Sequence, residues 1–332
     1  MQSLNWTQKK RKEIIEINMK LEDGYISYII NPKAGASSHK YLSSEFKAYL
    51  EKRGFDVRVN LTKSLAHACE LATDAAVDFD CAMVVTVGGD GTIREVLHGL
   101  EGSDKPLMMV PCGTENLLAS ELGFDMKLST LIKTFESGHT RSLDLGVANG
   151  KCFTSICGFG FDADVVELVS AVRDGHINHL DYFWPIWRTF WNYKFDTIKV
   201  IADGEEVFND RGFVFVGNIS RYAIGLNILR NAKIDDGLLD LCIYKCASKA
   251  RLIKHSAFTV FKQHHYGKDV IYKHVKKISV SSPSSAIKCE VDGDPGPNLP
   301  VEIEVLPGAV TVAAPENGKP AGISTRFLRS LG

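Results

Sequence analysis

The sequence predicts an α/β protein in which an N-terminal parallel α/β domain is followed by a C-terminal antiparallel β-sandwich domain. Apolar runs with the length of buried strands alternate with helical patterns over residues 25–142, as is typical of a parallel sheet. Strand-like runs then follow one another over residues 143–314, with Gly, Asp and Pro turns between them. The chain has 332 residues, which is long enough for two domains that each bury a core.

The first domain is expected to contain four strands, each followed by a helix. Residues 24–30 and 81–87 are compact apolar runs, and each ends at a loop that contains glycine. The expected order is strand 24–30, helix 38–53, strand 56–61, helix 64–77, strand 81–87, helix 93–100, strand 107–110 and helix 114–122.

The second domain is expected to consist mainly of short strands, with helical patterns at about 162–172 and 248–264. A polar arm (residues 1–24) precedes the two domains, and a tail rich in Gly, Pro and Ser (residues 315–332) follows them. The strands are expected at 144–148, 153–157, 197–202, 212–217, 238–244, 277–282, 286–291 and 301–305.

The composition excludes several classes of protein. Apolar residues make up 45% of the chain and the net charge is -1, so neither a disordered chain nor a protein that coats nucleic acid is expected. No apolar run reaches the roughly 18 residues that span a bilayer, and the N-terminus does not resemble a secretory signal. The eight cysteines lack metal-binding spacing, and we expect reduced, buried thiols in a cytosolic protein.

The most informative motif is Val87-Gly88-Gly89-Asp90-Gly91-Thr92, which lies between an apolar strand and a helical stretch. Its glycines let the backbone approach a ligand closely, and the N–H groups at the start of the helix can bind phosphate oxygens. Asp90 adds a carboxylate, which beside phosphates acts through Mg²⁺ or as a base. A tight turn with a capping Asp is the alternative interpretation.

Two further loops, residues 31–35 and 111–116, also combine glycine with short polar side chains after a predicted strand. Because parallel strands end at the same edge of a sheet, the three loops together predict a nucleotide site there. The spacings of the P-loop and of the Rossmann dinucleotide fingerprint are both missing from the sequence.

In these segments the chain resembles the diacylglycerol kinase catalytic-domain family, which includes bacterial lipid kinases, sphingosine kinases and ceramide kinases. The resemblance covers roughly residues 25–313. The matching segments are NPKAG at 31–35, GGDGTIREVLHGL at 88–100, PCGTENLLASELG at 111–123, AKIDDGLLD at 232–240 and VDGD at 291–294.

The resemblance implies an ATP- and Mg²⁺-dependent kinase with its nucleotide site between the two domains. The positions expected to contact the nucleotide are Asn31, Pro32, Lys33, Ala34, Gly35, Thr62, Gly88, Gly89, Asp90, Gly91, Thr92, Glu95, Gly113, Thr114 and Asn116. It further implies a structural Mg²⁺ held by the backbone carbonyls of Lys233 and Leu238 and by the carboxylate of Asp236.

Asp294 occupies the position of the acidic residue that the family is proposed to use as proton acceptor, where the family has Glu. We expect Asp294 to be the base and Asp90 to organise Mg²⁺ and the phosphates; the reverse assignment stays open. Because Asp is one methylene shorter than Glu, Asp292 or Asp90 could take part of the role of proton acceptor. Two other departures are His98, where the family usually has Asn, and the Glu115-Asn116-Leu117 segment, where Gly/Ala-Asn-Asp is commoner.

Residues 182–195 hold eight of the 31 aromatic residues and three of the four tryptophans. Tryptophan favours an apolar–water boundary, so we expect Trp184, Trp187, Phe190 and Trp191 to bind a lipid. A core cluster or a dimer contact is the alternative. Residues 245–277 carry nine Lys/Arg against one acid, which could attract an anionic lipid surface or could form an ordinary solvated face.

Together these patterns predict a lipid kinase that transfers the γ-phosphate of ATP to the hydroxyl of diacylglycerol or a sphingoid-type lipid. We expect a cytoplasmic protein that contacts membranes transiently, binds no nucleic acid and has edge strands that would permit a homodimer. The alternatives are a soluble-metabolite kinase similar to NAD kinase and a lipid-binding regulatory protein on the same scaffold.

Overall fold

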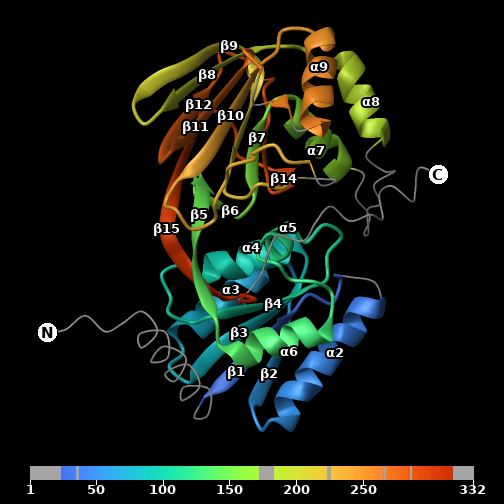
Figure 1. The fold of residues 1–332 in the computed structure, drawn as a ribbon, viewed down its shortest axis with the longest axis vertical. Coiled ribbons are helices and arrows are strands. Elements are labelled where there is room, and N and C mark those ends of the chain that lie inside the picture. The colour runs from blue at the N-terminus through green and yellow to red at the C-terminus, as the bar shows by residue number, and fades with distance from the viewer. Residues whose placement is uncertain are drawn as a thin grey trace, which may run out of the picture. The chain divides into compact units, whose positions relative to one another are not determined.

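The computed structural model describes residues 24–34, 37–171, 183–222, 226–261, 263–264, 267–284 and 286–316 (Figure 1). Gly35, nearly all of the expected arm and most of the expected tail therefore lie outside the described residues. The chain divides into two compact units: one takes the residues up to Leu143 and those from Ala309 onward, and the other is Asp144–Gly308.

The first unit is built on a parallel sheet. Its strands run in the order β2 (Asp56–Leu61), β1 (Tyr25–Ile30), β3 (Cys81–Gly88) and β4 (Leu107–Pro111). All eight residues of β3 are buried, as expected for a parallel strand covered on both faces. Near the end of the long strand β15 (Val301–Ala313), Val312 pairs in parallel with Leu107 of β4.

Helices connect these strands, and one of them begins earlier than the sequence pattern indicates. The helix expected at 93–100 is α4 (Asp90–Gly99), so part of the glycine motif forms its first turn. A helix that we did not predict is α6, where Leu131 and Phe135 are buried. The helices of this unit are α2 (Ser37–Lys52), α3 (Leu65–Val77), α4, α5 (Leu117–Glu121) and α6 (Leu128–Ser137).

The second unit is antiparallel, so the predicted fold class is confirmed in both halves of the chain. Strand β9 begins beside β8 and ends between β7 and β10, which joins two sheets through one strand. Apolar side chains from both sheets form one core cluster. The strands are β5 (Thr140–Ala148), β6 (Lys151–Phe153), β7 (Ile156–Phe159), β8 (Thr197–Ala202), β9 (Glu205–Gly217), β10 (Leu239–Lys245), β11 (Val270–Val275), β12 (Lys277–Ser281), β13 (Cys289–Val291), β14 (Asp294–Pro295) and β15.

Two strand predictions in this half are corrected, and one strand was not predicted. The single strand expected at 153–157 is the end of β6 and the start of β7, because the chain turns at residues 154–155. Strand β11 was missed because it lies in the basic stretch, where Lys273 and His274 interrupt the apolar pattern. Strand β15 was expected to end at 305 but continues to Ala313, because its last residues belong to the first unit, where Val312 pairs with Leu107.

Three helices lie on the second unit: α7 (Phe161–Ala171), α8 (Phe183–Asn192) and α9 (Lys249–Val260). Figure 1 shows α8 and α9 side by side, and side chains from all three helices line one pocket. In the described parts of the chain, none of the helices combines the length and the apolar character that a membrane crossing requires.

Candidate functional site

The β3–α4 loop has the geometry of an anion site at a helix N-terminus. Gly89 is the N-cap of α4, and its carbonyl oxygen accepts hydrogen bonds from the amides of Thr92 and Ile93, 3.0 Å in each case. A Cβ on Gly88 would lie 2.5 Å from the Cβ of Thr92, so only glycine fits. Asp90 is the first residue of the helix and half-buried, and a carboxylate is stabilised there by the helix dipole.

The loop after β4 packs directly on this glycine loop. A Cβ on Gly113 would lie 2.7 Å from the Cα of Gly89, and the amide of Cys112 donates to the Gly88 carbonyl at 2.8 Å. Asn116 holds the loop closed, because its Oδ1 accepts from the Gly113 amide at 2.7 Å and its Nδ2 donates to the Gly113 carbonyl at 3.0 Å. Burial raises the pKa of the Cys112 thiol to about 11, so this residue fills space rather than reacting.

The loop after β1 joins the same cluster. Nδ2 of Asn31 donates to Oγ1 of Thr92 at 2.9 Å, and the Asn31 amide donates to the Val87 carbonyl at 3.0 Å. Oδ1 of Asn31 accepts from the Lys33 amide at 3.0 Å, which shapes an Asx-turn. Pro32 and Lys33 are exposed and Ala34 is partly buried. The structure therefore brings the three glycine-containing loops together at one edge of the sheet.

The remaining predicted nucleotide residues border this cluster or stand beside it. The Thr62 amide donates to the Ile30 carbonyl at 2.8 Å, which places Thr62 next to the β1 loop. Thr114 is exposed at the tip of the β4 loop. Glu95 forms an ion pair with the buried Arg94, with 2.9 Å between Oε1 and Nη2.

Residues 291–294 form a two-residue hairpin turn between β13 and β14. Asp292 and Gly293 have φ of 50° and 78°, and Val291 pairs with Asp294. Positive φ at both central positions is typical of the type I′ turn, for which Asp-Gly is a preferred sequence. Asp294 follows the turn and is partly buried. Asp90 lies in the first unit and Asp294 in the second, and the prediction that the two acids meet stays a prediction.

Asp292 anchors this hairpin. Its carboxylate accepts hydrogen bonds from the amides of Thr154, Ser155 and Ile156, each at 2.9 Å, and from Oγ1 of Thr154 at 3.2 Å. Four such bonds hold this carboxylate in one orientation. Asp292 therefore holds the backbone next to Asp294 in place, and its share in the role of proton acceptor stays a prediction.

Two further acids lie beside the hairpin, one fully buried and one partly buried, and neither was predicted from the sequence. Glu290 is fully buried, and its Oε2 accepts from the Gly293 amide at 2.8 Å. Burial and the nearby Asp162 raise the pKa of Glu290 well above its usual range, and burial raises the pKa of Asp162 to about 6. Asp162 accepts from the Tyr222 hydroxyl. The sequence signal that could have identified them is an acidic residue inside an apolar strand or directly beside one.

The segment expected to hold a structural metal is organised by another missed acid, Asp144. Its carboxylate accepts from the amides of Gly237 at 2.6 Å and Gly308 at 2.7 Å. Asp236 and Lys233 are exposed, and Oδ1 of Asp236 accepts from the Leu238 amide at 3.2 Å. Two carbonyl oxygens and a carboxylate form an all-oxygen donor set, which fits Mg²⁺.

The aromatic stretch forms helix α8, and its tryptophans point to solvent. Trp184, Trp187 and Trp191 are 66%, 49% and 53% exposed, which excludes the core interpretation for these three side chains. Trp187 and Trp191 contact each other edge to face, with ring centroids 5.6 Å apart. Lys249 of α9 lies 5.1 Å from the centre of the Trp191 ring.

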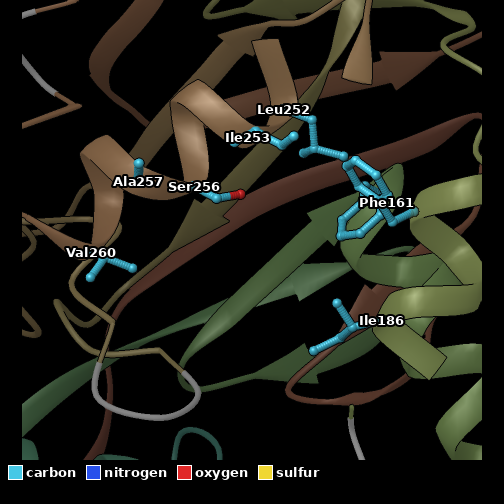
Figure 2. A pocket seen from close by; sticks show the side chains of 8 residues that line it. Phe161, Ile186, Leu252, Ile253, Ser256, Ala257 and Val260 are labelled. Atoms are coloured by element: carbon cyan, nitrogen blue, oxygen red, sulfur yellow. The ribbon is translucent and has the colours of Figure 1, made fainter. Parts of the chain in front are cut away.

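Helix α9 adds an apolar face next to these rings. Ile253, Phe258 and Val260 are exposed, as is Phe261 directly after the helix, which is 72% exposed. Between α8 and α9 lies a pocket of about 340 Å³ (Figure 2). Its lining is almost wholly apolar and consists of Phe161, Ile186, Phe190, Leu252, Ile253, Ser256, Ala257 and Val260. The volume is at the lower end of the range for small-molecule pockets.

Comparison with known proteins gives a consistent result over both units. Residues 26–148 match the family described as diacylglycerol kinase catalytic domain, and residues 155–314 match the one described as YegS C-terminal NAD kinase beta sandwich-like domain. A Mycobacterium tuberculosis protein named diacylglycerol kinase is 31% identical over 305 residues, which cover 90% of this chain and 97% of that protein. A Bacillus subtilis protein of the same name is 26% identical over 293 residues, which cover 87% and 95%.

A solved structure described as a diacylglycerol kinase from Bacillus anthracis has the same fold. It superposes with a TM-score of 0.65 over 89% of this chain and 98% of that chain, at 21% sequence identity. At this sequence identity, the structural similarity supports only the shared fold of two units.

Proposed function

The chain belongs to the diacylglycerol kinase catalytic-domain family, and we propose from this that it transfers the γ-phosphate of ATP to the hydroxyl group of a lipid. Diacylglycerol or a sphingoid-type lipid is the proposed acceptor. The observation that carries the lipid assignment is the apolar face of α8 and α9 with its adjoining pocket. A soluble acceptor such as NAD would not need three exposed tryptophans.

The nucleotide half of the proposal uses the cluster of glycine loops. The amides at the start of α4 would bind phosphate oxygens, and the close contact of Gly89 with Gly113 keeps side chains away from them. Asn31 and Thr92, which are hydrogen-bonded to each other, would border the phosphates. Mg²⁺, when bound, would neutralise phosphate charge, with Asp90 beside it as an oxygen ligand and Lys233, Asp236 and Leu238 as the structural site.

Asp294 is the proposed base. It would accept the proton of the lipid hydroxyl while the hydroxyl oxygen forms its bond to the γ-phosphorus, and the bond from that phosphorus to the bridging oxygen of ADP breaks. The tight turn and the four-bonded carboxylate of Asp292 hold its backbone in place.

The lipid half of the proposal uses α8 and α9. Phe190 faces the pocket, where an acyl segment would replace water against apolar walls. Trp184, Trp187 and Trp191 would enter the interfacial layer of a membrane, and Lys249 would face anionic headgroups. The result is a protein that contacts the surface from which it draws its substrate.

The test is phosphoryl transfer by the full-length protein from labelled Mg·ATP to diacylglycerol in mixed micelles, in parallel with NAD as acceptor. We expect phosphorylation of the lipid, at a rate that is about 100-fold or more lower in Asp294→Asn than in the wild type. The matched control is Asp210→Asn, because Asp210 is an exposed acid on β9. The paired change of Trp187 and Trp191 to Ser should lower binding to anionic vesicles without unfolding the protein.

Each alternative predicts a different result in this assay. Phosphorylation of NAD and not of the lipid would favour the soluble-metabolite kinase. Vesicle binding without turnover of either acceptor would favour the regulatory protein.

A further inference from the structure

A second group of metal-ligating side chains lies in the first unit, on helices α3 and α4 (Figure 1). It consists of Cys69, Glu95 and His98, whose ligand atoms all lie within 4.8 Å of one another. The sulfur of Cys69 is 3.9 Å from Nδ1 of His98. All three side chains are partly buried, so an ion could reach them from solvent.

The sequence explains how the three side chains meet. Glu95 and His98 are three residues apart on α4, which places them on one face of that helix. Gly99 follows, and a Cβ there would lie 2.4 Å from the Cys69 carbonyl oxygen and 2.7 Å from the Cβ of Ala72. The glycine therefore lets the two helices approach closely enough for Cys69 to face His98.

We propose that Cys69, Glu95 and His98 bind a thiophilic divalent metal ion, with Zn²⁺ as the ion that fits best. Thiolate, imidazole and carboxylate are the usual zinc ligands, whereas Mg²⁺ prefers oxygen alone. Bonds of about 2.0–2.3 Å in tetrahedral geometry place ligand atoms about 3.5 Å apart, so small side-chain rotations close the site. Three protein ligands leave the fourth position to water.

The charges around the site are compatible with a bound cation. Arg94 donates to Oε1 of Glu95 from both Nε and Nη2, so the second carboxylate oxygen can ligate the metal while the ion pair stays intact. Burial and the Glu95 carboxylate raise the pKa of the Cys69 thiol, so in the metal-free protein the sulfur keeps its proton. Binding displaces that proton and forms the metal–sulfur bond in its place, with no change of oxidation state.

This site is separate from the proposed Mg²⁺ positions and does not depend on the lipid-kinase assignment. It lies on the helix that starts at the glycine loop, and Glu95 belongs to both this site and the predicted nucleotide residues. An ion there would therefore link α3 to the helix that presents Asp90.

The decisive experiment uses the unmodified full-length protein and counts reactive thiols. All eight cysteines are free, and Cys69 alone is partly exposed while the other seven are buried. The native protein should therefore react with one equivalent of a thiol reagent. One equivalent of Zn²⁺ should slow that reaction at least tenfold, and millimolar Mg²⁺ should not. Unchanged labelling at saturating Zn²⁺ would overturn the proposal.

Variants give a second, spectroscopic readout with Co²⁺ as the probe. The wild-type protein should show the near-ultraviolet band of a cobalt–thiolate bond at one equivalent of Co²⁺. Cys69→Ser should lose that band, and His98→Asn should weaken Co²⁺ binding about tenfold or more. The control is His67→Gln, because His67 lies on α3, as Cys69 does, but is not one of the three proposed ligands. This variant should behave as the wild type. Equal Co²⁺ binding by all variants would refute the site, because it would indicate that Co²⁺ binds to histidines elsewhere on the surface.

Discussion

Replacing Asp292 with Asn should destabilise the second unit, because four hydrogen-bond donors face its two carboxylate oxygens. Its oxygens face three backbone amides and one hydroxyl, and the residues that supply the amides are almost fully buried. The amide of Asn has one oxygen and one NH₂ group. Either orientation therefore points a donor at a donor and leaves at least one buried N–H group without an acceptor.

The expected cost is about 3 kcal/mol: one unsatisfied buried donor contributes about 1–3 kcal/mol, and loss of the charge weakens the remaining bonds. For a unit of this size, a loss of about 3 kcal/mol lowers the melting temperature by about 6–12 °C. The measurement is thermal unfolding of Asp292→Asn followed by circular dichroism, with the exposed Asp210→Asn as the control.

The same experiment distinguishes the roles of the two acids of the hairpin. Asp294→Asn should melt within about 2 °C of the wild type, because Asp294 is not the anchor, while its turnover falls. A melting temperature for Asp292→Asn that matches the control would contradict the anchoring role. Full stability combined with lost turnover would instead assign Asp292 to the chemistry.

Three further predictions concern packing, capping and pH. Gly99→Ala should lower stability by about 1–3 kcal/mol in urea unfolding, because its Cβ would collide with the backbone oxygen of Cys69; a gain from the better helix former would contradict this. Ser64→Ala should cost about 0.5–2 kcal/mol, because its Oγ caps α3 by accepting from the amide of His67, while Ser64→Thr should retain most of the stability. Burial raises the pKa of Asp162 from 3.8 to about 6. The contribution of this group to the stability of the folded state is therefore fully present below pH 4, and about 3 kcal/mol of it is lost as the pH rises from 4 through 6. Asp162→Asn should flatten this part of the stability–pH curve, and an unchanged slope would assign the slope to other groups.

Local patterns were sufficient to predict most elements of the first unit, although α6 was missed. The uninterrupted apolar run of β3 and the glycines after it specify a buried strand followed by a tight loop, since both depend on neighbours in the chain. The three loops could also be predicted to share an edge, because parallel strands end on the same side of a sheet. The start of α4 was missed by three residues, because Gly91 inside a first turn resembles a loop.

Contacts between distant residues decided the rest. The partners of Asp292 lie about 136 positions earlier in the chain, and the end of β15 pairs with β4, about 200 positions away. Glu290, Asp162 and Asp144 acquire their partners only when several strands are assembled.

The sequence by itself determined most of the strands and helices, the glycine loops and the aromatic stretch, because these depend on residue type and short-range spacing. Only the tertiary structure decided that Trp184, Trp187 and Trp191 face solvent, since an amphipathic aromatic helix has the same pattern in a core. Likewise, only packing at Gly99 brought Cys69 beside His98. The physical reason is that burial, and the partners of a charged or metal-ligating group, depend on which distant segments cover it.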